Sequence, residues 1–296
     1  MIIKVRVLSD MHVGSSYGIC PRHLMVKKPN AFQDWVIDRW TEMCKKEPTD
    51  YLYLLGDIVD GENLKDTSGL CIPDKEEQAN AAIELIRPLI GRHTKVLGVS
   101  GSRYHCAGIA RTITERLNGK HSVSFTSLLL DRFGMEGITF HHKSTNSRTE
   151  VTKILIRRGR FPKAPTVGML VGGHLHRYEY IVQDGVRVIH TPCWEYETPF
   201  MDHSMGFDIG SIQLYIDTDK KCISVIEDDR FVVPREVFVG MQSWEGVSPA
   251  DYAAMEIRKK ERELQDAKEL VAQSLAIAKL GSKTESSRPG RKHKVK

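Results

Sequence analysis

Acidic residues and histidines recur at the ends of apolar runs in this sequence. Asp10 and His12 follow residues 2–8, Asp57 and Asp60 of a Gly-Asp-x-x-Asp motif follow residues 51–55, and His174 and His176 of a Gly-His-x-His motif follow residues 167–171. A histidine pair, His141 and His142, ends a fourth run. Carboxylate and imidazole ligands together favour Mn, Fe or Zn, whereas Mg and Ca prefer oxygen ligands alone. The pattern therefore predicts a metal site with mixed nitrogen and oxygen ligands.

The elements that must position these residues alternate between short apolar runs and amphipathic stretches. The patterning predicts strands at residues 2–8, 51–55, 95–100, 138–141 and 167–171, and helices at 31–46, 74–90, 107–117 and 148–158. After residue 171 it predicts hairpin strands at 178–183, 186–190, 211–217 and 222–228. This succession is typical of an α/β fold, in which ligands bind at the carboxyl ends of the parallel strands. The acidic and histidine motifs lie at those ends.

Length and composition exclude several classes of protein. The chain has 296 residues, of which 41% are apolar, so it can bury a large core and is not expected to be disordered. It has no run of ~18 apolar residues that could span a bilayer, and its first residues alternate charge with aliphatic side chains, unlike a signal peptide. The six cysteines form no C-x-x-C pair, which argues against a zinc ribbon and a disulfide scaffold. We therefore expect a soluble, cytoplasmic protein with no membrane partner.

The charge is concentrated at the C-terminal end. Residues 281–296 contain six Lys or Arg and one Glu, which accounts for the whole net charge of +5. We expect one domain at residues 1–240, a charged helix at 248–280 that begins at Ser248-Pro249, and a disordered basic tail at 281–296. The tail is a candidate contact for DNA or RNA. The sequence does not indicate an oligomeric state.

The motifs in this order resemble a known family. Asp-x-His, Gly-Asp-x-x-Asp, a central glycine-containing loop, a later histidine and Gly-His-x-His are similar to the motifs of the calcineurin-like metallophosphoesterase superfamily, over residues 2–217. The resemblance implies a four-layer α/β/β/α sandwich and two divalent metal ions, with Mn favoured over Fe, Zn or Mg. It also implies hydrolysis of phosphomonoesters or phosphodiesters by a hydroxide that the metals hold.

The resemblance also implies a ligand set. Asp10, His12 and His176 would bind the first metal, Asp57 would bridge, and His174 with His141 would bind the second. Two ions ~3.5–4 Å apart can stabilise both the attacking and the leaving oxygen of an in-line displacement. Adjacent side chains of a strand point to opposite faces, so only one of the paired histidines should enter the site. We take His141 as the ligand, with His142 as the alternative.

The central loop, Gly101-Ser102-Arg103-Tyr104-His105, departs from the family pattern, which is usually Gly-Asn-His followed by an acid. Ser102 would be a weaker, neutral metal ligand, and Arg103 could bind phosphate but could not donate a proton near pH 7. His105 could act as the general acid, oriented by Asp60. Some phage-associated relatives are similar in this loop, so the resemblance is to a diverged, phage-associated type.

These observations favour a metal-dependent phosphoesterase. A phosphodiester or nucleic-acid substrate is slightly favoured, because the tail is basic and a diester with a good leaving group needs less protonation. A phosphomonoesterase or protein phosphatase is an alternative. A second alternative is a non-catalytic metal-binding or structural module that keeps the fold, which the altered central loop suggests.

Overall fold

The computed structural model describes residues 1–25, 28–61, 69–106, 108–143, 167–196, 207–227 and 229–242, together with residues 257, 264 and 268. Met1–Pro249 form one compact unit and Ala250–Lys296 a second. All the strands and helices described below belong to the first unit. The predicted helix at 148–158 and the basic tail lie outside the described residues, and only three residues of the predicted helix at 248–280 are described.

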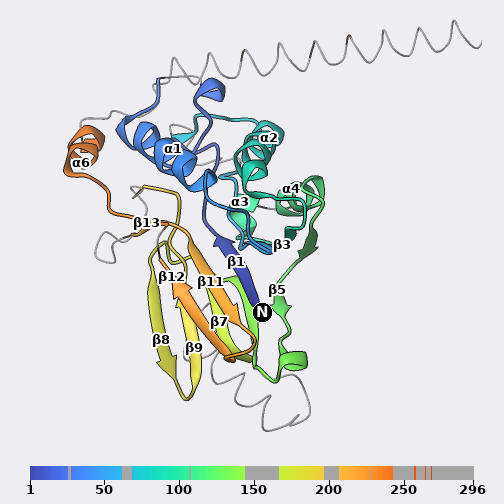
Figure 1. The fold of residues 1–296 in the computed structure, drawn as a ribbon. Helices are drawn as coiled ribbons and strands as arrows, with labels where there is room; N and C mark the ends of the chain where they lie inside the picture. Colours follow the sequence, from blue (N-terminus) through green and yellow to red (C-terminus); the bar gives the residue numbers. More distant parts are fainter. Residues whose placement is uncertain are drawn as a thin grey trace, which may run out of the picture. The chain divides into compact units, whose positions relative to one another are not determined.

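The strands form two larger sheets and one two-stranded ribbon (Figure 1). The first sheet has the order β12-β11-β1-β2-β3-β4, with β1 at Ile2–Leu8, β2 at Tyr51–Leu54, β3 at Lys95–Val99, β4 at Lys120–Ser122, β11 at Ile212–Asp217 and β12 at Cys222–Ile226. The second has the order β5-β6-β7-β9-β8, with β5 at Phe125–Leu128, β6 at Gly137–Lys143, β7 at Val167–Gly173, β8 at Glu179–Gln183 and β9 at Val186–His190. The ribbon pairs β10 at Ile209–Gly210 with β13 at Arg230–Phe231.

Strand direction decides which strand ends lie together. In the first sheet β1, β2, β3 and β4 run parallel, and in the second β6, β7 and β9 run parallel. The outer pairs β1–β11, β11–β12, β5–β6 and β8–β9 are antiparallel. Each sheet therefore gathers the carboxyl ends of its parallel strands at one edge.

Two of the described helices begin at residues whose side chains cap them. The helices are α1 at Ala31–Cys44, α2 at Lys75–Ile86, α3 at Arg103–Cys106, α4 at Ile109–Arg116 and α6 at Arg235–Gln242, with 3-10 turns at Arg22–Leu24, Arg87–Leu89 and Asp131–Phe133. Asn30 and Gln33 form a reciprocal capping box at the start of α1. Asp74 accepts hydrogen bonds from the backbone of Glu76 and Glu77 at the start of α2.

The alternation of β2 shows how the layers pack. Leu52 and Leu54 point into a core that the first sheet shares with α1, α2, α4 and α6. Tyr53 and Leu55 point the other way, into a core between the two sheets. The Tyr53 ring stacks there on Phe140 of β6, with the ring centroids 3.7 Å apart. The first sheet is therefore buried on both faces, by helices on one side and by the second sheet on the other.

The predicted α/β fold is confirmed. The described residues form a helical layer, the first sheet and the second sheet, and they do not include a second helical layer. Strands β4, β5, β10 and β13 and helices α3 and α6 were not predicted. No helix among the described residues is both long and apolar enough to cross a membrane.

Candidate metal centre

Residues from the carboxyl ends of strands in both sheets meet at one place. Asp10 and His12 follow β1, Asp57 and Asp60 follow β2, Ser102 follows β3, His142 lies near the end of β6, His174 and His176 follow β7, and Glu195 follows β9. Three groups of three among the described residues could each hold a metal ion: a first group of Asp10, His12 and His176, a second of Asp57, His142 and His174, and a further group of His12, Asp60 and His105 that shares His12 with the first.

The backbone at this place is unusual. Of the eight described non-glycine residues with positive φ, five are candidate ligands: Asp10, His12, Asp57, His174 and His176, with φ between 44° and 76°. Such conformations cost of order 1 kcal/mol each for residues with a Cβ and persist where the surrounding structure fixes them, often at functional sites. The chain therefore turns sharply after β1, β2 and β7 and directs these side chains toward one another.

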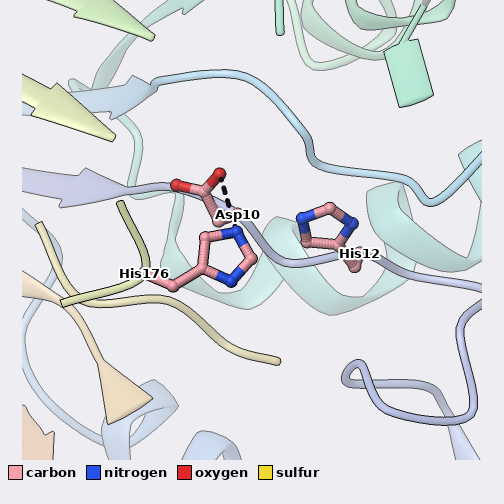
Figure 2. A group of neighbouring side chains, drawn as sticks. All are labelled: Asp10, His12 and His176. Carbon is pink, nitrogen blue, oxygen red and sulfur yellow. Dashed lines mark ion pairs between the residues drawn. The ribbon is translucent and has the colours of Figure 1, made fainter. Parts of the chain in front are cut away.

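The first group is Asp10, His12 and His176 (Figure 2). Asp10 Oδ1 lies 3.5 Å from His176 Nε2, and the His12 and His176 ring centroids are 5.2 Å apart. The second carboxylate oxygen, Asp10 Oδ2, accepts hydrogen bonds from the His174 backbone at 2.8 Å and from the Ser9 hydroxyl. A Cβ on Gly173 would lie 2.6 Å from Asp10 Oδ2, so β7 can approach Asp10 this closely only with glycine there.

The second group is Asp57, His142 and His174. His142 Nε2 lies 3.0 Å from Asp57 Oδ2, and the His142 and His174 ring centroids are 5.1 Å apart. His142 Nδ1 lies 2.7 Å from the Leu55 carbonyl oxygen. Because a carbonyl oxygen only accepts, Nδ1 carries the hydrogen and Nε2 is the nitrogen available to a cation.

The structure corrects the choice between the two adjacent histidines. His142, rather than the expected His141, lies beside Asp57. Phe140 of β6 points into the core between the sheets, and alternation brings His142 to that same side of the strand. His141 pairs in register with Gly172 and points to the opposite face. There it contributes, after burial, to lowering the pKa of His190.

The central loop holds the Asp57 carboxylate in place by hydrogen bonds. Its Oδ1 accepts hydrogen bonds from the Ser102 backbone at 2.8 Å and from the Ser102 hydroxyl at 3.2 Å. A Cβ on Gly101 would overlap the backbone and carboxylate of Asp57, so glycine is required for this contact. Ser102 thus lies beside the expected bridging carboxylate, while its role as a metal ligand stays a prediction.

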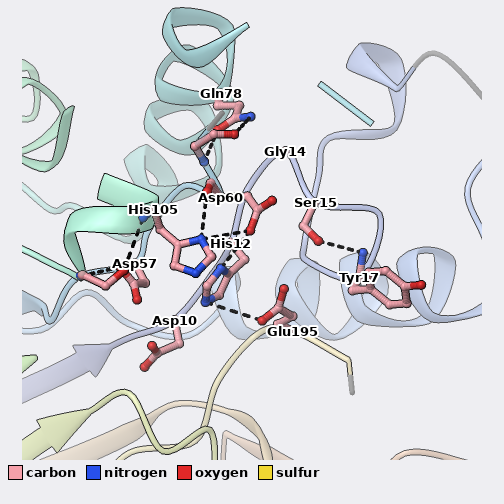
Figure 3. Close-up of polar contacts among 12 residues, drawn as sticks. Asp10, His12, Gly14, Ser15, Tyr17, Asp57, Asp60, Gln78, His105 and Glu195 are labelled. Carbon is pink, nitrogen blue, oxygen red and sulfur yellow. Dashed lines mark hydrogen bonds and ion pairs between the residues drawn. The ribbon is translucent and has the colours of Figure 1, made fainter. Parts of the chain in front are cut away.

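His105 and Asp60 lie together, as the sequence predicted (Figure 3). His105 Nδ1 lies 2.8 Å from the Asp60 carbonyl oxygen and 3.2 Å from Asp60 Oδ1. Nδ1 therefore donates its hydrogen to Asp60, which leaves Nε2 of this partly exposed ring for proton exchange. Asp60 Oδ1 also lies 3.2 Å from His12 Nδ1, so one carboxylate contacts both imidazoles. Arg103, the first residue of α3, is exposed, and its predicted contact with phosphate stays a prediction.

Glu195 is a residue of the site that none of the sequence motifs indicates. This buried carboxylate lies with Oε2 3.5 Å from both His12 Nε2 and His176 Nδ1. The available signal was its position five residues after the strand at 186–190. The sequence pattern predicts that strand only as part of a hairpin, but β9 also runs parallel to β7, which brings its carboxyl end to the site.

The charged groups shift one another's pKa values. Burial alone would lower the pKa of His12, but Glu195 and Asp60 outweigh it and raise this pKa to about 9. Burial likewise opposes protonation of His142 and His176, yet Asp57 and Asp10 raise the pKa of His142, and Cys193 together with Asp10 raises the pKa of His176. Burial would raise the pKa of Asp10 and Asp57, but the histidines hold each of these pKa values well below its usual range. The imidazoles thus carry the positive charge that balances the buried carboxylates.

The residues present fit a divalent cation. Four buried atoms of the two groups form no well-directed hydrogen bond: Asp10 Oδ1, His12 Nε2, His142 Nε2 and His176 Nδ1. For His142 Nε2, the contact with Asp57 Oδ2 at 3.0 Å is an ion-pair contact. Leaving buried polar atoms unpaired costs ~1–3 kcal/mol each, so such a cluster is unfavourable without a further partner. The combination of carboxylate oxygens and imidazole nitrogens matches Mn, Fe or Zn. The Mn expectation itself stays a prediction.

Comparison with known proteins gives only distant similarity. No protein-family model matches the chain, and no curated protein matches it either. Among solved structures it is similar to Vps29 from Entamoeba histolytica complexed with Zn²⁺, at 13% identity over 77% of this chain and 98% of that chain, with a TM-score of 0.40. It is also similar to Vps29 from Chaetomium thermophilum, at 10% identity over 76% and 93% of the two chains, with a TM-score of 0.42. A third similar structure is YfcE, a phosphoesterase from E. coli, at 13% identity over 76% and 98%, with a TM-score of 0.41. These TM-scores are too low to support an argument about activity, which must come from the chain's own site.

Proposed function

We propose that this protein is a phosphoesterase that uses two divalent cations to hydrolyse phosphoester bonds, with a phosphodiester as the favoured substrate. The observation that carries the proposal is the meeting of two carboxylate and imidazole groups at the strand ends, with unpaired buried donor and acceptor atoms in both. A single cation site would need only one of these groups. Two adjacent groups are the arrangement that two-metal phosphoryl transfer requires.

The candidate residues would have the following roles. Asp10, His12 and His176 would hold one cation and Asp57, His142 and His174 the other. The bridging role that the family resemblance implies for Asp57 stays a prediction. Bound cations would lower the pKa of a water molecule and neutralise phosphoryl oxygens. Ser102 holds the Asp57 carboxylate in place through Oδ1, which leaves Oδ2 on the His142 side.

A proton for the leaving group would come from His105. Its Nδ1 is fixed by Asp60, so Nε2 is the atom that would carry the transferable proton. Arg103 is close in sequence and exposed, and we propose that it binds a phosphate oxygen of the substrate. The basic tail supports a nucleic-acid substrate by its composition, and this contact stays a prediction because those residues lie outside the described part of the chain.

The proposal is tested by Asp57→Asn. Asparagine is nearly isosteric and tolerates the left-handed backbone at this position, so the substitution removes the charge without straining the chain. We expect Mn²⁺ titration of the chelator-stripped protein to give two bound ions in the wild type and one or none in the variant. Hydrolysis of an activated aryl phosphodiester and an activated monoester should be lost with the second ion.

Asp184→Asn is the matched control, because Asp184 also has a positive φ but lies in the turn between β8 and β9, away from the site. It should bind two ions and retain activity. Retained hydrolysis in Asp57→Asn would refute the assignment. Wild-type protein that binds cations without turnover on either ester would instead favour the non-catalytic module.

A further inference from the structure

Glu195 is a buried carboxylate that belongs to none of the candidate ligand groups. Its Oε2 lies 3.5 Å from His12 Nε2 and 3.5 Å from His176 Nδ1. Neither nitrogen has a hydrogen-bond partner. Figure 3 shows Glu195 on the opposite side of the His12 ring from Asp60. One carboxylate oxygen therefore faces both imidazoles of the first group.

The segment around Glu195 is tied to the loop that carries the first group. The Trp194 backbone donates to the Asp10 carbonyl oxygen at 2.9 Å, and the Tyr196 backbone donates to the Tyr17 carbonyl oxygen at 2.7 Å. Glu195 itself forms an isolated bridge with Gly18. These backbone hydrogen bonds fix the segment around Glu195 relative to the loop that carries Asp10 and His12.

The partners of Glu195 suggest a role in the site rather than in the fold. No Lys or Arg in the described part of the chain forms an ion pair with it, whereas the buried Asp229 lies 3.4 Å from Arg6 and 2.6 Å from Lys46. A buried carboxylate without a permanent cation is costly. Among the described residues, the ion-pair partners of Glu195 are the imidazoles of His12 and His176.

The two nitrogens of His176 have different neighbours. Nε2 faces Asp10 Oδ1, and Nδ1 faces Glu195. A histidine that binds a metal usually donates its other N–H to a carboxylate or carbonyl, which fixes the ring and makes the ligating nitrogen more basic. His142 has this arrangement through the Leu55 carbonyl oxygen. Glu195 stands in the corresponding position for His176.

We propose that Glu195 is a positioning residue of the first centre: it accepts the Nδ1 hydrogen of His176 and adds a negative charge beside His12, and thereby raises the affinity of this centre for a divalent cation. The inference rests on the proposed two-cation site. It differs from that proposal because it predicts that one centre, and not the other, depends on Glu195.

The experiment measures Mn²⁺ affinity with only one centre intact at a time. His142→Ala leaves the first group, and His176→Ala leaves the second; free Mn²⁺ is followed by its paramagnetic resonance signal. Adding Glu195→Gln to the His142→Ala protein should weaken Mn²⁺ binding by ~10–100-fold, the usual cost of losing such a partner. Adding it to the His176→Ala protein should change the affinity by less than about twofold. Glu195→Asp, which keeps the charge but withdraws it by one methylene, should give a smaller loss in the first case.

Glu179→Gln is the matched control, since Glu179 is a half-buried carboxylate of β8 that pairs with Arg177 and lies outside both groups. It should leave both affinities unchanged. Equal weakening of both centres by Glu195→Gln, as general damage to the fold would produce, overturns the inference, and so does an unchanged first centre. If wild-type protein binds no Mn²⁺, the proposed function fails and this inference fails with it.

Discussion

Metal-free protein should lose stability as the pH rises from about 6.5 to about 9, because His12 releases its proton over this range. In the folded chain the pKa of His12 is raised to about 9 by Glu195 and Asp60, against a usual value near 6.5. Below pH 6.5 both the folded and the unfolded chain carry the proton, so the full stabilisation is present. Between the two pKa values only the folded chain carries it, and the stabilisation falls until it is lost above pH 9.

The size of the effect follows from the shift. A shift of about 2.5 pKa units at about 1.4 kcal/mol per unit corresponds to about 3 kcal/mol of unfolding free energy. His12 is buried, so solvent does not screen this interaction strongly. The raised pKa values of His142 and His176 act in the same direction. The lowered pKa of His190 affects stability only below pH 6.5, outside this range.

The assay is urea unfolding of chelator-treated protein at half-unit steps from pH 6 to 9.5. The free energy of unfolding of the wild type should fall by at least about 3 kcal/mol across the range. His12→Gln cannot titrate there and should fall by about 3 kcal/mol less than the wild type. His23→Gln, at an exposed position, is the control and should follow the wild type. Equal slopes for wild type and His12→Gln, or a wild type that is stable throughout, would refute the reasoning.

Two further predictions concern individual histidines. His105→Ala should slow hydrolysis of an unactivated monoester by ~10²–10⁴-fold and an activated aryl ester much less, because only the poor leaving group needs a proton; equal losses in steady-state rates would contradict a general-acid role. His142→Ala should reduce Mn²⁺ stoichiometry from two to one, whereas His141→Ala should leave it at two, since only His142 lies beside Asp57. The reverse result in equilibrium dialysis would restore the original assignment of His141.

The parts of the fold that were predictable are those with strong local patterns. β1, α1, α2 and the β8–β9 hairpin lie close to their predicted ranges because alternation, helical periodicity and the Asp184-Gly185 turn are all visible in the sequence. β4 is a run of Lys, His and Ser, and β5 is a four-residue run with a single buried residue, Leu128, so neither carries a strong apolar signal. Their pairing depends on neighbours distant in sequence, which local patterns do not report.

The site residues also differ in whether local sequence patterns indicate them or only the pairing of strands distant in sequence does. The motifs brought Asp10, His12, Asp57, His174 and His176 into consideration because each follows an apolar strand. Ile138 and Phe140 face the core and His142 lies on the same side of β6, but the predicted strand ends at His141, two residues before the observed end at Lys143. The sequence could not indicate Glu195, because its place in the site depends on the parallel pairing of β9 with β7, and no local sequence pattern predicts that pairing.

The site as a whole links cation binding to proton release. Carboxylates that are buried at strand ends need positive charge nearby, and in the metal-free chain the protonated imidazoles of His12, His142 and His176 supply it. A cation can bind these same nitrogens only after their protons leave. Stability without metal should therefore be greater near pH 6 than near pH 9, while affinity for the cation should increase as the pH rises through this range. The protons on these imidazoles stabilise the metal-free site and also compete with the cation for the same nitrogens. An activity that depends on the cation should therefore increase through the pH range in which metal-free stability declines.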